Sequence, residues 1–172
     1  GSRPELLGAT ALPTPPESLV ICNGFKDQEY LEAASDACRL GKQVVVVVEK
    51  PFEIDQILDI AGKQEFLPRI GIRIRLQSKG SGLWEKSGGF ASKFGLTTLQ
   101  LLRAVERFQA AGLGKRVALL HFHIGSQITD IRYVKAALEE IGRYYVEVRE
   151  LGFDLTHVDV GGGLGVDYEG SR

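Results

Sequence analysis

Five short apolar runs rich in β-branched residues recur along the chain, and an amphipathic segment lies between many of them. Five consecutive valines in the second run disfavour a helix, because β-branched side chains lose χ1 freedom there. A run that is apolar at every position is typical of a strand covered on both faces, as in a parallel sheet. We therefore expect strands at Leu19–Cys22, Val44–Val48, Ile70–Leu76, Val117–Ile124 and Thr156–Val160.

The segments between the runs carry helix start and stop signals. Alternating strands and helices predict βα units with right-handed crossovers and a parallel sheet. Two α/β architectures fit this order, an open doubly wound sheet and part of a (β/α)8 barrel, and strand periodicity does not separate them. We expect four helices. The first begins at Asp27 and ends at Gly41, the second begins at Pro51, the third begins at Thr97 and ends at Gly112, and the fourth begins at Thr129 or Asp130 and ends at Gly152.

Composition excludes several classes of protein. The chain is 44% hydrophobic and 25% charged with a net charge of −1, which is typical of a globular domain and leaves no charge excess for nucleic acid or an anionic membrane. The longest apolar run is far too short to span a bilayer. Two cysteines without a Cys-x-x-Cys pattern favour reduced thiols and a cytoplasmic protein.

A glycine cluster follows the fifth run. Gly161, Gly162, Gly163 and Gly165 remove the β-carbons from this segment. Backbone N–H groups can then approach an anion closely, and phosphate is the usual ligand of such a loop. A tight turn between a strand and a helix is the alternative.

Two histidines end the fourth run. Alternation places His121 and His123 on one face, where an imidazole can stack on a ring, transfer a proton or bind a metal. Ser126 could add a hydroxyl to a phosphate site. The alternative is a core histidine with a satisfied hydrogen bond. No third ligand stands out, so zinc is not favoured, and His157 is interpreted as structural.

Arg73 and Arg75 share one face of the third run, where arginines need a partner. A carboxylate or phosphate ligand is one interpretation, and an ion pair with a neighbouring strand or helix is the other. Lys50 precedes Pro51 and is interpreted as part of a helix entry. The polar segment 77–89, with Trp84, is either a lid over a site or a surface insertion.

Several motifs together resemble one family, the biosynthetic arginine decarboxylases. The His-x-Gly-Ser and Gly-Gly-Gly elements are shared with the wider group of fold-type III pyridoxal-phosphate decarboxylases, whereas the Asn-Gly-Phe-Lys-Asp and Ser-Lys-Gly-Ser-Gly-x-Trp elements are specific to the arginine branch. The resemblance covers nearly the whole chain and rests on residues 21–27, 73–76, 78–82, 92–95, 121–127 and 159–168.

The resemblance implies an alanine-racemase-like (β/α)8 barrel with pyridoxal 5'-phosphate as cofactor, Mg2+ dependence, and conversion of L-arginine to agmatine and CO2 in polyamine and spermidine synthesis. It implies that His123 stacks on the pyridine ring and that Ser126 and Gly161, Gly162 and Gly163 bind the phosphate. Arg75, or less favourably Arg73, would lie near the ring, and 93–95 would form a supporting wall.

The same resemblance implies that residues 1–172 are the central part of the cofactor-binding barrel domain, with strands three to seven. The chain contains no Met and stops soon after its glycine cluster, so we expect a segment of a longer protein. The resemblance implies that this protein is a homo-oligomer. The Schiff-base lysine would lie upstream, and the C-terminal β domain downstream, so the segment alone should be inactive. Ornithine, lysine or diaminopimelate decarboxylase and a non-catalytic phosphate-binding βα domain are the alternatives.

Overall fold

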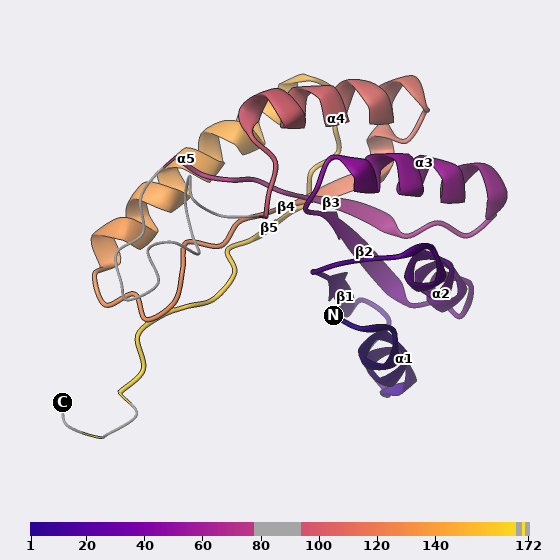
Figure 1. Cartoon of the computed structure of the whole chain (residues 1–172), viewed down its shortest axis with the longest axis horizontal. Helices are drawn as coiled ribbons and strands as arrows, with labels where there is room; N and C mark the ends of the chain where they lie inside the picture. The colour runs from indigo at the N-terminus through magenta and orange to yellow at the C-terminus, as the bar shows by residue number, and fades with distance from the viewer. Residues whose placement is uncertain (78–93, 168–169, 171–172) are drawn as a thin grey trace.

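The computed structural model describes residues 1–77, 94–167 and 170, in which helices alternate with strands (Figure 1). A short 3-10 turn, η3 (Gly114–Arg116), precedes the fourth strand. The elements in chain order are α1 (Arg3–Ala11), β1 (Leu19–Cys22), α2 (Gln28–Arg39), β2 (Gln43–Val48), α3 (Phe52–Lys63), β3 (Arg69–Arg73), α4 (Thr98–Ala110), β4 (Val117–His121), α5 (Ile131–Glu150) and β5 (His157–Asp159).

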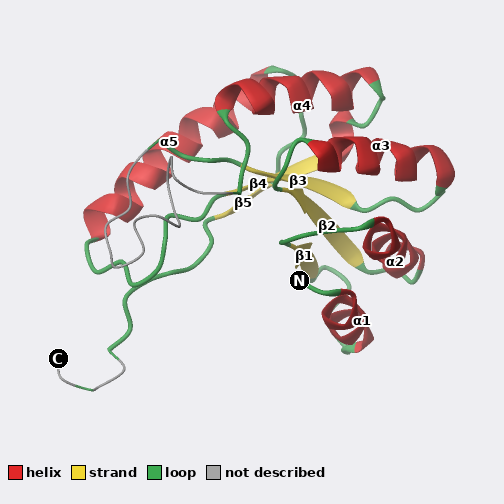
Figure 2. Cartoon of the chain, viewed as in Figure 1, coloured by secondary structure: helices red, strands yellow, loops and turns green. Residues whose placement is uncertain are grey.

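The five strands form one parallel sheet in the order β1-β2-β3-β4-β5. Each strand therefore pairs with the next strand along the chain. A doubly wound sheet reverses its strand order at a switch point, and this sheet contains no reversal. Together with the curl of the sheet, the order identifies a half-barrel of the (β/α)8 type (Figure 2).

The two faces of the sheet bury different amounts of apolar surface. The helices cover the outer face, where alternate strand residues such as Val46, Ile72 and Leu120 join Phe108 of α4 in the main core. The inner face carries a small second cluster of Val45, Val47 and Leu119, with Leu19 against it. Helices on one face and strand side chains on the other are the layers of a barrel wall.

Local sequence signals explain where most helices begin. The Asp27 carboxylate accepts a hydrogen bond of 2.8 Å from the Tyr30 amide, and Asp130 caps α5 in the same way. Thr97 and Gln100 form the predicted capping box of α4. Helix α3 begins at Phe52, with Pro51 as its cap, one residue later than predicted.

Two features differ from the sequence prediction. Helix α1 was not expected, because its apolar periodicity is weak. In the structure only one of its residues, Leu6, is buried. Strands β3 and β4 end at Arg73 and His121, three residues before the apolar runs end. The continuing residues Leu76 and Ile124 are buried in the main core, so their apolar character reflects packing outside the regular strands.

Gly71 of β3 leaves room for the side chains of its neighbouring strands on the inner face. A β-carbon at this position would lie 3.0 Å from both Leu119 Cδ2 and Val47 Cγ2. Gly71→Val should therefore lower the free energy of unfolding by about 1–3 kcal/mol through overpacking, measured by urea denaturation of the protein that contains this domain.

The matched control is Gly62→Val in α3, where a β-carbon has no heavy atom within 4 Å. This exposed substitution should change the free energy of unfolding by less than about 0.5 kcal/mol. Equal effects of the two substitutions would contradict the close packing of the inner face.

Candidate functional site

The carboxyl ends of β2 to β5 meet at one edge of the sheet, because all strands run parallel. Arg73 pairs in register with His121, and His121 pairs with Asp159. Glu49 directly follows β2, whose register with β3 places it beside Arg73. Four polar side chains, Glu49, Arg73, His121 and Asp159, thus form one row across the sheet, which we call the polar row.

The first half of the polar row is a buried ion pair. Glu49 Oε1 lies 2.8 Å from Arg73 Nη1, and the side chains are 3% and 11% exposed. A second buried ion pair supports it, since Lys26 Nζ lies 3.0 Å from Glu53 Oε1, and Glu53 Oε2 accepts a 2.6 Å hydrogen bond from the Glu49 amide. For Arg73, the structure contains the ion pair that the sequence analysis named as one of two interpretations.

The second half of the polar row joins His121 to Asp159. His121 Nδ1 lies 3.0 Å from Asp159 Oδ2 and 3.2 Å from the Asp159 carbonyl oxygen. Both of these atoms accept hydrogen bonds, so we assign the proton to Nδ1. Burial lowers the pKa of His121, Arg73 lowers it further, and Asp159 opposes the shift. His121 is therefore neutral at pH 7 and donates to the Asp159 carboxylate.

His123 lies directly beside the glycine cluster. A β-carbon on Gly161 would lie 2.6 Å from the Phe122 carbonyl oxygen and 3.3 Å from His123 Nδ1. The imidazole is half-buried, and its Nδ1 atom has no hydrogen-bond partner among the described residues. Burial and the positive charge of Arg73 lower the pKa of His123, and they outweigh the opposing effects of the Gly162 backbone and of Asp159, so the ring is also neutral at pH 7.

Backbone hydrogen bonds join the segment after β4 to the segment after β5. The Ile128 amide donates to the Gly163 carbonyl at 2.8 Å, and the Gly165 amide donates to the Ile128 carbonyl at 2.9 Å. A β-carbon on Gly163 would lie only 1.9 Å from the Gly125 carbonyl oxygen. The close approach of these two segments therefore requires glycine at position 163.

The structure brings most of the predicted site residues to one place. His123 and the exposed Gly161 and Gly162 lie at the same edge of the sheet as Gly163, and Gly163 also contacts the backbone of exposed Ser126. Figure 1 shows the two segments leaving neighbouring strands β4 and β5. The arrangement combines a neutral imidazole, a hydroxyl and a turn without β-carbons, which is suited to a ligand with both a flat ring and a phosphate.

The two arginines occupy different positions. Arg73 belongs to the polar row and acts electrostatically on both His121 and His123. Arg75, which the sequence analysis favoured near the ring, donates from Nη2 to the Gly95 carbonyl at 3.3 Å, and its Nε is buried without a partner among the described residues. Its cofactor contact stays a prediction.

Other predicted residues lie in ordinary structural positions. His157 Nδ1 lies 2.7 Å from Thr156 Oγ1 at the start of β5. Lys50 Nζ lies 5.3 Å from the centre of the Phe94 ring, and its amide donates to Glu53 at the entry of α3. Of the predicted lid 77–89 only Gln77 is described; Trp84 and the rest of the lid, and Lys93 of the supporting wall, lie outside the described residues.

Sequence reasoning assigned no role to Glu49 and Asp159. Both could have been identified in the same way as the histidines, because each lies at or near the end of an apolar run, where polar side chains of parallel strands gather. Glu49 stands next to Lys50, which was interpreted as part of a helix entry, and Asp159 was considered only as part of the fifth strand and of the motif 159–168. What they share is a place in the polar row, and the register of the four strands is what aligns the residues of this row.

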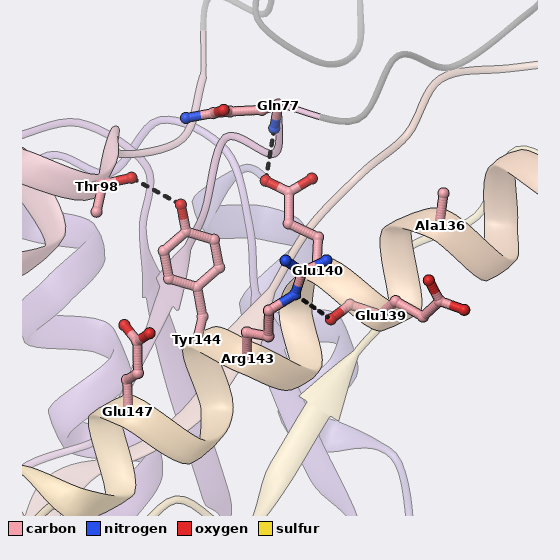
Figure 3. A pocket seen from close by; sticks show the side chains of 8 residues that line it. All are labelled: Gln77, Thr98, Ala136, Glu139, Glu140, Arg143, Tyr144 and Glu147. Atoms are coloured by element: carbon pink, nitrogen blue, oxygen red, sulfur yellow. Dashed lines mark hydrogen bonds between the residues drawn. The ribbon is translucent and has the colours of Figure 1, made fainter.

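A separate pocket of about 590 Å3 lies between α5 and the start of α4 (Figure 3). Most of its lining residues are polar, and two pairs of them are hydrogen-bonded: Thr98 Oγ1 lies 2.7 Å from the Tyr144 hydroxyl, and the Gln77 amide donates to Glu140 at 2.7 Å. None of the predicted site residues lines this pocket. It is distinct from the polar row and the glycine turn.

Known proteins share both the sequence and the fold of this chain. Biosynthetic arginine decarboxylases from Bacteroides thetaiotaomicron and Tolumonas auensis are 50% and 51% identical over all 172 residues. This chain spans 27% of the length of each of these relatives.

Among solved structures, the biosynthetic arginine decarboxylase of Campylobacter jejuni matches 98% of this chain with a TM-score of 0.85 and 36% identity, over 27% of its own length. A model for the pyridoxal binding domain of pyridoxal-dependent decarboxylases matches residues 1–172. The chain therefore belongs to the pyridoxal-dependent decarboxylase family, through the pyridoxal binding domain of that family.

Proposed function

We propose that this chain is part of a biosynthetic arginine decarboxylase, which converts L-arginine to agmatine and CO2. The observation that carries the proposal is the half-buried, neutral His123 next to the glycine turn 161–163, in a chain about 50% identical to such enzymes along its whole length. The activity requires a longer polypeptide, because this chain spans only 27% of those relatives.

The described residues fit the phosphorylated, aromatic pyridoxal 5'-phosphate. Gly161 and Gly163 have positive φ angles of 66° and 107° and no space for a β-carbon, so the turn presents backbone rather than side chains. Amides in such a turn can bind phosphate oxygens, and exposed Ser126 adds a hydroxyl from the adjoining segment. We propose Gly161, Gly162, Gly163 and Ser126 as the phosphate ligands.

His123 supplies a flat face for the pyridine ring. A neutral imidazole stacks without bringing a second positive charge next to Arg73, and its lowered pKa keeps it in this form. When bound, the cofactor supplies an electron sink for the electron pair that remains after the carboxylate leaves. The residues of this chain bind and orient that cofactor and hold it against the carboxyl ends of the strands.

The remaining chemical groups are proposed to lie in other parts of the protein. The family resemblance implies that the lysine that bonds to the cofactor lies upstream, and that the acidic partner of the pyridine nitrogen and the substrate-binding carboxylates lie downstream. Residues 1–172 would then be the central part of the barrel domain, without decarboxylase activity of their own.

A decarboxylase for another amino acid is the second candidate. The diaminopimelate decarboxylase of Helicobacter pylori, solved with L-lysine, matches 90% of this chain with a TM-score of 0.74 and 28% identity. Ornithine and lysine are further substrates that the same scaffold could serve. The 50% identity with arginine decarboxylases favours L-arginine.

The finer properties implied by the resemblance stay predictions: spermidine synthesis, a cytoplasmic location, homo-oligomers and Mg2+ dependence. No group of three or more His, Cys, Asp and Glu side chains in residues 1–77, 94–167 and 170 could hold a metal ion. None of the helices in the same residues is long and apolar enough to cross a membrane.

The proposed reaction can be tested with the complete decarboxylase that contains this chain. Supplied with pyridoxal 5'-phosphate, it should release agmatine from labelled L-arginine at a kcat/KM at least about 100-fold above that for L-ornithine, L-lysine or diaminopimelate. Product analysis by mass spectrometry checks this. If one of the other three amino acids reacted faster, that amino acid rather than L-arginine would be the substrate, and the proposal would be wrong.

Two neighbouring glycines provide a matched test of the phosphate turn. Gly163→Ala should raise the dissociation constant of pyridoxal 5'-phosphate at least about tenfold, because its β-carbon would collide with the Gly125 carbonyl at a positive φ. Gly162→Ala should have a smaller effect, since a β-carbon there has no heavy atom within 4 Å and the amide remains. Fluorescence titration of the cofactor-free enzyme measures both constants, and equal effects would argue against the proposed turn geometry.

A further inference from the structure

Asp159 connects the polar row to the glycine turn. Its Oδ2 atom lies 3.0 Å from His121 Nδ1, and its Oδ1 atom accepts a 2.9 Å hydrogen bond from the Gly161 amide. Its carbonyl oxygen also accepts a 3.1 Å hydrogen bond from the Phe122 amide. One residue therefore links a buried imidazole of β4 to the first amide of the glycine turn.

His121, the partner of Asp159, is buried between its neighbours in the polar row. The His121 side chain is 6% exposed, whereas that of Asp159 is 24% exposed. His121 lies in register between Arg73 and Asp159, and Arg73 is itself held by Glu49 at 2.8 Å. The polar row thus runs from the buried interior to the edge where the glycine turn begins.

The glycine turn needs such an anchor. Glycine residues have many accessible backbone conformations, and holding one of them has an entropic cost that a hydrogen bond can offset. The turn is exposed at Gly161 and Gly162 and follows the three-residue strand β5, which pairs only with β4 among the described residues. The bond from Gly161 to Asp159 fixes the point where the turn leaves the sheet.

We propose that Asp159 and His121 are positioning residues that hold the Gly161–Gly163 turn in the conformation that binds the cofactor phosphate. This inference rests on the proposed function. Neither side chain needs to touch the cofactor. The Asp159 carboxylate acts through the Gly161 amide, and the His121 Nδ1–H group keeps that carboxylate oriented.

A general contribution to folding is the competing explanation, and the cofactor itself offers a way to separate the two. Pyridoxal has the same ring as pyridoxal 5'-phosphate but lacks the phosphate. A residue that acts through the phosphate turn should affect the phosphorylated molecule alone, whereas a residue needed for the barrel as a whole should affect the binding of both.

The experiment uses the complete decarboxylase in its cofactor-free form. Asp159→Asn keeps the size of the side chain but replaces one of the two carboxylate oxygens, which accept separately from His121 Nδ1–H and the Gly161 amide, by an NH2 donor. It should raise the dissociation constant of pyridoxal 5'-phosphate about tenfold and that of pyridoxal less than about twofold. Asp154→Asn, an exposed substitution five residues earlier, is the matched control and should change neither constant.

Two substitutions of His121 test the other half of the linkage. His121→Leu removes the donor and should reproduce the phosphate-specific loss. His121→Asn places an amide N–H near the position of Nδ1 and should restore affinity to within about threefold of the original protein. This pair also keeps the inference testable if the Asp159 variant does not fold.

The outcomes are distinguishable. Equal weakening of both ligands, no weakening by Asp159→Asn, or no difference between the two His121 variants would overturn the positioning role. If the unchanged enzyme bound pyridoxal as tightly as pyridoxal 5'-phosphate, the phosphate site of the proposed function would fail, and the inference with it.

Discussion

Parallel pairing of each strand with its successor is the constraint on which the site depends. It places the carboxyl ends of β2, β3, β4 and β5 at one edge of a curled sheet. The register then aligns side chains that are up to 110 residues apart in sequence, from Glu49 to Asp159. Any chemistry at the ends of the strands is therefore concentrated in one row and in the segments immediately above it.

Burying charge at this edge requires compensation for lost hydration, and the structure supplies it pair by pair. Arg73 has Glu49 as its partner, and Lys26 has Glu53, with all four side chains at most 11% exposed. The Glu49 amide joins the two pairs by donating to Glu53. A site supported in this way resists rearrangement, because removing one member would leave a buried charge without its partner.

The helices with strong local signals were predictable, and the weakly amphipathic helix was not. Asp27, Thr97 and Asp130 cap helices as expected, since a cap depends on residues two or three positions apart. Strand ends were misjudged in β3 and β4 because an apolar run continues into residues that are buried for other reasons. Arg73 and Arg75 are equivalent by alternation, and only their neighbours on other strands and loops distinguish them.

Local sequence determined the alternation of strands and helices and most helix caps, because each depends on spacing within a few positions. Strand periodicity left open the choice between an open sheet and a barrel, and the structure confirms the barrel that the family resemblance implied. The pairing of Glu49 with Arg73 and of His121 with Asp159, and the contact of Gly163 with Gly125, were decided only in three dimensions. The physical reason is that strand order and register bring distant residues together, and a single sequence carries no local signal for either.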